Sequence, residues 1–248
     1  LIVNGEGTIH SNNEKGLWLL KVSEYAKKRN KKSVLINSIF QNNNKLLKKY
    51  LDYFDIISVR ESLSYNELKL INVNSEIVPD LTFYNKFLIS HKTRKKVDIL
   101  FGDCVKTDKS NNNLKYSRKY LNSSFISILN KKVINLRSLK PIDILKFIRN
   151  QTMFNFKKFQ FKYFNHYFIN TYQYRYYGKY NIEQYLRKLI SSKIHISGRF
   201  HSICFSLISF TPFLAQSSNT FKIQGLLNDI GLRNRFIVVM ILQIPLIF

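Results

Sequence analysis

Short apolar runs alternate with amphipathic stretches along most of the chain. The apolar runs cover residues 1–3, 33–38, 56–59, 97–101, 125–129, 193–196 and 213–215. The stretches with helical spacing of apolar residues, or with a helix start signal, cover 15–28, 45–53, 63–70, 141–149, 181–190, 200–210 and 221–230. Strands that alternate with helices are typical of α/β layering around a parallel sheet, so we expect this fold class.

The boundaries of the helices carry recognisable signals. Pro141 stands in the first turn of one predicted helix. Thr220 is placed to cap the helix at 221–230, and Gly231 is placed to end it.

Changes in composition divide the chain into two predicted domains. A polar, basic stretch at 91–96 is the best linker candidate, and it separates an N-terminal domain at 1–90 from a C-terminal domain at 97–235. Residues 152–180 interleave aromatic and basic side chains without a clean period and are expected to be an insertion. Residues 236–248 are almost wholly apolar and are interpreted as a tail, for which a non-native origin stays open. Because the chain opens directly on a strand and ends on this tail, we expect both domains to be incomplete.

The composition indicates a globular protein with an unusual charge. Hydrophobic residues make up 45% of the 248 residues and charged residues 22%, which is ordinary for a folded domain. The net charge of +25 is compatible with nucleic acid, an anionic membrane surface or a polyanionic substrate. However, the lysines are scattered, alanine occurs only at Ala26 and Ala215, and Asn, Ile, Phe and Tyr are abundant. This pattern favours an AT-rich coding bias over nucleic-acid binding.

The cysteine content and the termini bear on the compartment. Cys104 and Cys204 are far apart and have no Cys or His at ligand spacing, so we expect neither a disulfide framework nor a zinc site. The low cysteine content is typical of a reducing compartment, so we expect a cytoplasmic protein. The start of the chain lacks the features of a signal peptide. The apolar tail is shorter than the ~20 residues of a spanning helix, and Pro245 interrupts it. The insertion at 152–180 is either packed on the second domain or faces anionic lipid, which would place the protein at the inner face of the membrane.

The strongest local signal lies at 196–201, where an apolar strand ends at Gly198 and a helix begins. Arg199 and His201 therefore lie beside the free N–H groups of a helix N-terminus, which favour an anion. The alternative is a surface arginine followed by a core histidine.

Two further cations are expected at the same edge of the sheets. Arg60 follows the strand at 56–59, and Lys222 stands in the first turn of the last helix. The carboxyl ends of parallel strands share one edge, where ligands bind, so both should converge with the residues after Gly198. Alternatively, Arg60 is solvated and pairs with Glu61. Asp80 is expected to have a structural role in capping the turn that follows it.

Four motifs occur in order along the chain: Val-Arg-Glu-Ser-x-Ser at 59–64, Val-Pro-Asp-Leu-Thr-Phe at 78–83, Gly-Arg-Phe-His-Ser at 198–202 and Lys-Ile-Gln-Gly-Leu-Leu at 222–227. Together with the opening Asn-Gly-Glu-Gly-Thr-Ile-His at 4–10, they resemble the polysaccharide pyruvyl transferase family over residues 1 to about 232. The resemblance implies two Rossmann-like parallel-sheet domains that face a cleft, as in the B-type glycosyltransferases. It also implies transfer of the pyruvyl group of phosphoenolpyruvate to a sugar as a cyclic ketal, in surface polysaccharide biosynthesis such as that of a capsule.

The resemblance assigns roles to individual residues. Its Arg-x-His motif falls on Arg199 and His201, its later lysine on Lys222, and its earlier arginine on Arg60. The three cations would hold phosphoenolpyruvate, and His201, with an ordinary pKa of about 6.5, would be the general acid. No cofactor or metal is expected. The family's upstream glycine-asparagine motif is absent, and the helices after the lysine region differ from the family pattern.

The partner expected on the acceptor side is a saccharide or a lipid-linked saccharide, with peripheral membrane contact. Glu6 and His10, in the opening glycine loop, are the acceptor-side candidates, although a plain tight turn explains the loop equally well. Three other functions remain open: a nucleotide-sugar glycosyltransferase on the same scaffold, a non-catalytic remnant, and a basic nucleic-acid-binding protein. The preferred hypothesis expects no nucleic-acid partner.

Overall fold

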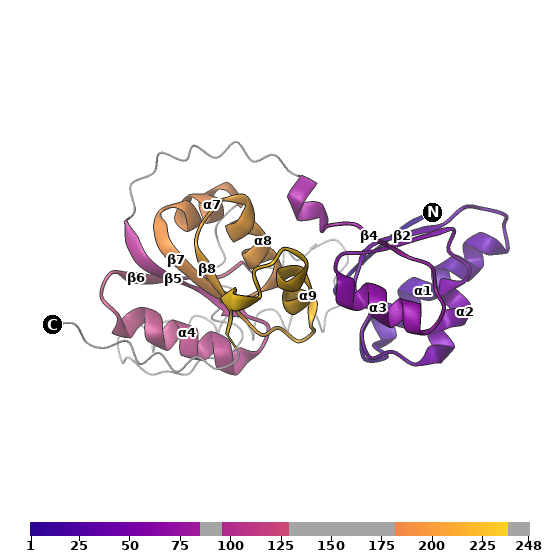
Figure 1. Ribbon diagram of the computed structural model, residues 1–248, viewed down its shortest axis with the longest axis horizontal. Helices are drawn as coiled ribbons and strands as arrows, with labels where there is room; N and C mark the ends of the chain where they lie inside the picture. The colour runs from indigo at the N-terminus through magenta and orange to yellow at the C-terminus, as the bar shows by residue number, and fades with distance from the viewer. Residues whose placement is uncertain (85–95, 129–181, 238–248) are drawn as a thin grey trace, which may run out of the picture.

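The structure, a computed structural model, describes residues 1–84, 96–128 and 182–237. Within them the chain forms two parallel sheets, one of four strands in the N-terminal part and one of five in the C-terminal part (Figure 1). The predicted α/β class with parallel sheets is therefore confirmed. None of the described helices is both long and apolar enough to cross a membrane.

The first sheet has the strand order β1-β2-β3-β4. Its strands are β1 (Ile2–Glu6), β2 (Val34–Ser38), β3 (Ile56–Val59) and β4 (Glu76–Ile77), and its helical segments are α1 (Glu14–Lys27), η1 (Lys45–Leu47), α2 (Lys48–Leu51), α3 (Ser62–Leu70) and η2 (Leu81–Tyr84). The helix α1 begins where the Asn13 side chain accepts a hydrogen bond from the backbone of Lys15. Alternating strand residues such as Val3, Leu35 and Ile57 pack with helix residues in one apolar core.

The second sheet has the order β6-β5-β7-β8-β9. Its strands are β5 (Val97–Cys104), β6 (Ser123–Ile126), β7 (Ser192–Gly198), β8 (Phe213–Gln216) and β9 (Phe236–Ile237), and its helical segments are α4 (Thr107–Lys119), α7 (Ile182–Ile190), α8 (Phe200–Ile208), α9 (Lys222–Asp229) and η4 (Arg233–Arg235). The strand β5 lies between β6 and β7, next to the edge strand of this sheet. Helices α8 and α9 follow β7 and β8 and share an apolar cluster with the sheet.

Three details of the sequence analysis are wrong. Helix α4 was not expected, because its exposed face is polar and its buried positions include Ser110 and Asn113. Thr220 does not cap α9: the N-cap is Phe221, and the buried hydroxyl of Thr220 has no hydrogen-bond partner in the described part. Phe236 and Ile237, placed in the apolar tail, form β9 and pair with β8.

Other expectations fall on residues that the structure does not describe. These are most of the linker at 91–96, the helix at 141–149, the insertion at 152–180 and the tail from residue 238 onward. Cys104 and Cys204 are both free and buried.

The two parts of the chain contact each other through α3 and α9 (Figure 1). The backbone N–H of Ser62 donates to the Asp229 carboxylate at 2.8 Å. The Glu61 carboxylate lies directly against Gly225, where any Cβ would collide with it, so α3 approaches α9 this closely only because residue 225 is glycine. This contact brings the helix that follows β3 to the helix that follows β8.

Candidate active site

Arg60 is a buried cation at the carboxyl end of β3. Its side chain is 1% exposed, its Nη1 donates to Asp80 Oδ2 at 2.6 Å, and its guanidinium carbon lies 4.4 Å from the centre of the Phe200 ring. The ion pair and the cation–π contact compensate for burial of the charge. The buried Nε still has no hydrogen-bond partner within the described residues. The alternative that Arg60 is solvated and pairs with Glu61 is wrong, because Glu61 instead accepts from the backbone of Ser64 at the start of α3.

Asp80 links Arg60 to the turn after β4. Its Oδ1 accepts from the backbone N–H of Thr82 at 2.9 Å, which confirms the expected turn-capping role. Burial acts to raise the pKa of Asp80, but hydrogen bonds from His201 and Thr82 and the charge of Arg60 outweigh it, so the pKa is lowered well below its ordinary 3.8. Asp80 is therefore an ionised group of the site as well as a cap, a role that sequence reasoning missed.

His201 lies in the first turn of α8 with its ring open to solvent. Its side chain is 42% exposed, and its Nε2 is 3.7 Å from Asp80 Oδ2 and 3.8 Å from Glu6 Oε2. The Phe200 ring stands edge-on to the imidazole, with 5.7 Å between the centroids. The alternative of a core histidine is wrong. An accessible imidazole between two carboxylates is suited to proton transfer.

Arg199 is the N-cap residue of α8 and pairs with the carboxylate of Asp103. Its Nε donates to Asp103 Oδ2 at 2.8 Å, and most of the side chain is buried. The pKa of Asp103 is raised, because the effect of burial exceeds the opposing effects of the Arg199 charge and of the hydrogen bonds. The terminal guanidinium nitrogens have no partner among the described residues, so the planar end of Arg199 stays available to a ligand.

Lys222 is the first residue of α9 and is 9% exposed. Its Nζ donates to Asn219 Oδ1 at 3.3 Å, and it has no carboxylate within 4.0 Å among the described residues. Burial, followed by the charges of Arg60 and Arg199, lowers its pKa to about 8, against smaller opposing effects of two carboxylates. This buried ammonium therefore lacks the counter-ion that each arginine has.

The cations surround the glycine loop after β1. A Cβ on Gly7 would lie 3.1 Å from Lys222 Nζ and 3.5 Å from Arg60 Nη2. The expected convergence of Arg60, His201 and Lys222 is thus present, and Arg199 is close enough to act on the charge of Lys222. The loop places the N-terminal part of the chain against the helix N-termini of the C-terminal part.

The N-termini of α8 and α9 add partial positive charge to this region. Neither helix has a side-chain cap, so backbone N–H groups in the first turn of each are left for a ligand or water. Aligned peptide dipoles make such positions favourable for anions. The site therefore combines three cations with two helix N-termini.

The two acceptor-side candidates differ in position. Glu6 ends β1, its side chain is 45% exposed, and its Oε2 is 3.8 Å from both His201 Nε2 and Arg60 Nη1. His10 contacts Ser11 at 3.5 Å, and burial, followed by the charge of Lys222, lowers its pKa. Glu6 thus belongs to the cluster around His201, whereas His10 lies on the Lys222 side.

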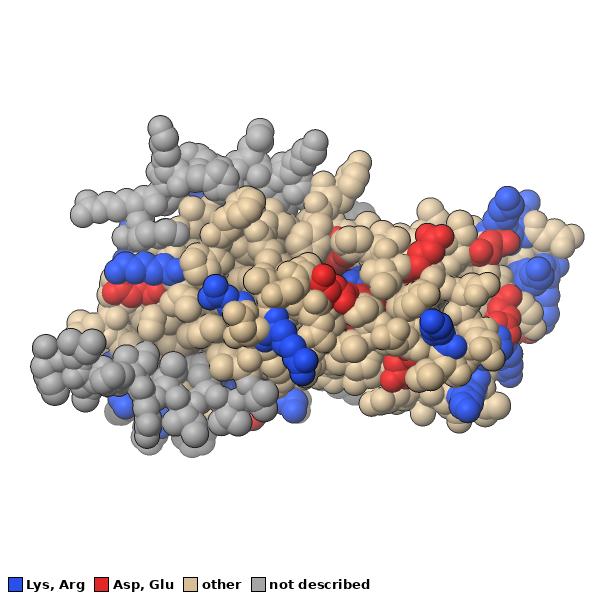
Figure 2. Space-filling view, in the orientation of Figure 1, with Lys and Arg blue, Asp and Glu red and all other residues tan. Residues whose placement is uncertain are grey.

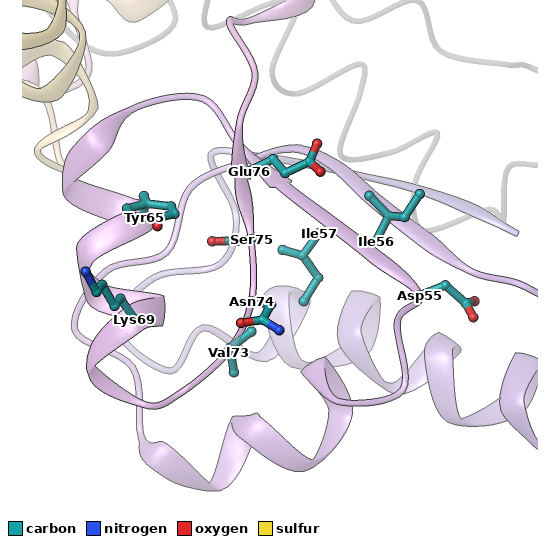
Figure 3. A pocket seen from close by; sticks show the side chains of 9 residues that line it. All are labelled: Asp55, Ile56, Ile57, Tyr65, Lys69, Val73, Asn74, Ser75 and Glu76. Atoms are coloured by element: carbon teal, nitrogen blue, oxygen red, sulfur yellow. The ribbon is translucent and has the colours of Figure 1, made fainter.

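Two other features of the described residues bear on the site. No group of three or more His, Cys, Asp and Glu side chains in residues 1–84, 96–128 and 182–237 is suited to hold a metal ion. A cavity of about 410 Å³ opens beside Asp55, Tyr65 and Glu76, at the start of β3 and β4 (Figure 3). Because Arg60 follows the other end of β3, this cavity is separate from the cation cluster.

Comparison with known proteins identifies a family whose model matches most of the chain. A family model described as polysaccharide pyruvyl transferase matches residues 1–219. No curated protein matches the chain. A functionally uncharacterised protein from Klebsiella pneumoniae subsp. pneumoniae has a similar crystal structure, with a TM-score of 0.52 and 13% sequence identity over 96% of this chain and 75% of that one. At this identity the likeness concerns the fold alone.

Proposed function

The chain belongs to the polysaccharide pyruvyl transferase family, and we propose that it transfers the pyruvyl group of phosphoenolpyruvate to a saccharide as a cyclic ketal. Family membership supports a transferase with a role in polysaccharide biosynthesis. The donor, the site residues and the two-domain cleft arrangement of a B-type glycosyltransferase are part of the proposal. A capsule or another surface polysaccharide is the expected product.

The observation that carries the proposal is a buried lysine without a carboxylate partner, next to two arginines that each have one. Arg60 and Arg199 each have a buried carboxylate partner, whereas Lys222 has none within 4.0 Å in the described part. Phosphoenolpyruvate carries a phosphate and a carboxylate on one three-carbon unit. A compact ligand with two anionic groups would neutralise Lys222 and engage the free guanidinium nitrogens at once.

The proposed reaction begins at the methylene carbon of phosphoenolpyruvate. His201 gives a proton to this carbon while an acceptor hydroxyl attacks the neighbouring carbon, which bears the phosphate. The carbon–oxygen bond to phosphate then breaks, and the electron pair leaves with phosphate. A second hydroxyl of the same sugar attacks the resulting cation and closes the ketal. Arg60, Arg199 and Lys222 stabilise the phosphate as its negative charge grows.

The acceptor and its location extend the proposal. We infer a saccharide or lipid-linked saccharide acceptor that approaches from the side of Glu6 and His10, and a cytoplasmic protein at the inner face of the membrane. The stretch at 152–180 that would touch lipid lies outside the described residues. The reaction as proposed needs neither a cofactor nor a metal.

Substitution of the acid tests this chemistry. His201→Ala should abolish formation of the ketal from phosphoenolpyruvate and a panel of p-nitrophenyl hexosides, as measured by mass spectrometry of the products. Because the imidazole is accessible and outside the apolar core, the free energy of unfolding should be unchanged, and phosphoenolpyruvate should still bind. Unchanged turnover would remove His201 from the acid role.

The distribution of charge favours this function over nucleic-acid binding. On the face seen in Figure 2, Lys and Arg side chains gather at the right-hand end with Asp and Glu among them, and elsewhere they are separated by neutral surface. A protein that binds nucleic acid through phosphates should present a continuous positive face. Steep, salt-dependent binding of DNA or RNA would contradict the preferred function.

A further inference from the structure

Two asparagines hold the carboxylate of Glu6 near the carboxyl ends of β1 and β2. Asn4 Nδ2 donates to Glu6 Oε1 at 3.3 Å, and Asn37 Nδ2 donates to the same oxygen at 3.4 Å. Asn37 Nδ2 also donates to Asn4 Oδ1 at 3.2 Å, so the two amides support each other. Both amides engage Oε1 only, which leaves Oε2 directed at His201 and Arg60.

This arrangement is kept at a local cost in stability. Glu6 has φ +48° and Asn37 has φ +52°, both in the left-handed region. Asparagine tolerates this conformation, but a glutamate there is strained. In addition, Oδ1 of the buried Asn37 has no hydrogen-bond partner among the described residues, and an unpaired buried acceptor is destabilising. Costs of this kind concentrate where function requires them.

Resting on the proposed function, we propose that Asn4, Glu6 and Asn37 form the acceptor subsite, and that Glu6 is the base that takes the protons of the two attacking hydroxyls. The ligand class is a vicinal or 1,3-diol of a hexose. The amides align the carboxylate and offer further polar atoms to sugar hydroxyls. The exposed Oε2 receives the protons.

The proton balance supports a base next to His201. Formation of the ketal removes two hydroxyl protons, whereas the methylene carbon gains one and the departing phosphate gains one. Glu6 takes the first hydroxyl proton and returns it to the imidazole across the short gap between Oε2 and Nε2, 3.8 Å in the free site. It then takes the second proton, which leaves with phosphate. Both residues thus end each cycle in their starting states.

The other nearby groups are less suited to this role. Asp80 is almost fully buried and already accepts from Arg60 and Thr82, so an acceptor hydroxyl has little access to it. His10 makes no ion pair with a carboxylate among the described side chains, and burial, followed by the charge of Lys222, lowers its pKa, which makes it a weaker base. Glu6 alone of these combines exposure with a position next to His201.

The test compares Glu6→Gln and Glu6→Asp with wild type, with the exposed Glu14→Gln as a control for the loss of one carboxylate. Ketal formation is followed with phosphoenolpyruvate and p-nitrophenyl hexosides, and phosphoenolpyruvate binding is measured by calorimetry. We expect Glu6→Gln to lower kcat by about 100-fold or more, the usual contribution of a general base. Its Kd for phosphoenolpyruvate should be unchanged or lower, because a negative charge beside Arg60 is removed. Glu6→Asp should recover part of the rate, and Glu14→Gln should match wild type.

Three results would count against this inference, and they separate it from the proposed function. A wild-type rate for Glu6→Gln would overturn the base role while leaving pyruvyl transfer intact. Weaker phosphoenolpyruvate binding by Glu6→Gln, in proportion to its loss of rate, would show that Glu6 only supports the donor site. Absence of transfer by wild type to every hexoside, together with absence of phosphoenolpyruvate binding, would overturn the proposed function and the subsite with it.

Discussion

Replacement of Lys222 by methionine should stabilise the free protein and weaken its binding of phosphoenolpyruvate. Lys222 is buried without a carboxylate within 4.0 Å in the described residues, and its pKa is lowered from 10.5 to about 8. One pKa unit corresponds to about 1.4 kcal/mol, so the charged form costs the empty site roughly 3 kcal/mol. Methionine has a similar length and carries no charge, so it should recover about 1–3 kcal/mol of this cost.

The dependence on pH gives this prediction a distinctive sign. The unfolded chain binds more protons than the folded chain between about pH 8 and 10.5, because the pKa of Lys222 is lower when folded. The contribution of Lys222 to stability therefore rises with pH across this window, and the full penalty is present below pH 8. The stability advantage of Lys222→Met should be largest at neutral pH and shrink as the pH approaches 10.

Urea unfolding followed by circular dichroism measures the first effect, and calorimetry with phosphoenolpyruvate measures the second. Loss of a hydrogen bond to a charged ligand group should weaken binding by about 10–100-fold. The exposed Lys115→Met, in α4, is the matched control and should change neither property appreciably. Destabilisation by Lys222→Met at neutral pH, or wild-type affinity for phosphoenolpyruvate, would refute the reasoning.

Two other substitutions test the anchored arginines. Arg199→Lys should weaken phosphoenolpyruvate binding by roughly tenfold or more in calorimetry. An ammonium cannot both replace the Nε contact to Asp103 and present a planar pair of donors to the ligand. Wild-type affinity would argue against direct contact between Arg199 and phosphoenolpyruvate. Asp80→Asn should lower the free energy of unfolding by about 3–5 kcal/mol at neutral pH, because it leaves buried Arg60 without its counter-ion. The pKa of Asp80 is lowered on folding, so its contribution is present above its ordinary 3.8 and is lost as the pH falls below that value. Urea unfolding should thus show the gap to wild type narrow in acid, and a gap that does not depend on pH would contradict this account.

The strands and most helices of the described residues could be predicted because apolar periodicity reports burial directly. Runs such as those that became β2 and β3 have one or both faces in the core, and their pattern shows it. Helix α4 could not be found this way, because part of its contact with β5 is polar, although Leu114, Tyr116 and Tyr120 also pack near Phe101. Asn113 Nδ2 donates to the carbonyl of Gly102 at 2.7 Å, and Ser110 Oγ accepts from the backbone of Cys104 at 2.7 Å.

The cations of the candidate site could be predicted from the sequence, but the carboxylates that pair with them could not. Arg60 and Lys222 follow strands along the chain, and the topology of parallel sheets brings them together. The choice of Asp80 for Arg60 depends on the path of the loop after β4, and the choice of Asp103 for Arg199 depends on β5 lying next to β7; periodicity encodes neither. For Asp80, the signal was present as a carboxylate directly after a strand, but the same residue type also caps turns, and here it does both.

The same limit applies to the start of α9. A threonine two residues before the first helical residue resembles a cap, yet the Phe221 N–H donates to Gln41 Oε1 at 2.9 Å instead. A side chain from the other part of the chain thus holds the N-cap residue itself, and the first turn of α9 stays without a side-chain cap. Sequence spacing alone does not reveal such a long-range partner.

Calorimetric titration of the full chain with phosphoenolpyruvate, and separately with uridine diphosphate, tests the central claim most directly. If Arg60, Arg199 and Lys222 form the donor site, phosphoenolpyruvate should bind to wild type and to His201→Ala, bind weakly to Lys222→Met, and be unaffected by uridine diphosphate. Binding of uridine diphosphate without phosphoenolpyruvate would instead indicate a nucleotide-sugar glycosyltransferase. Binding of neither ligand would favour a non-catalytic remnant and would contradict the account.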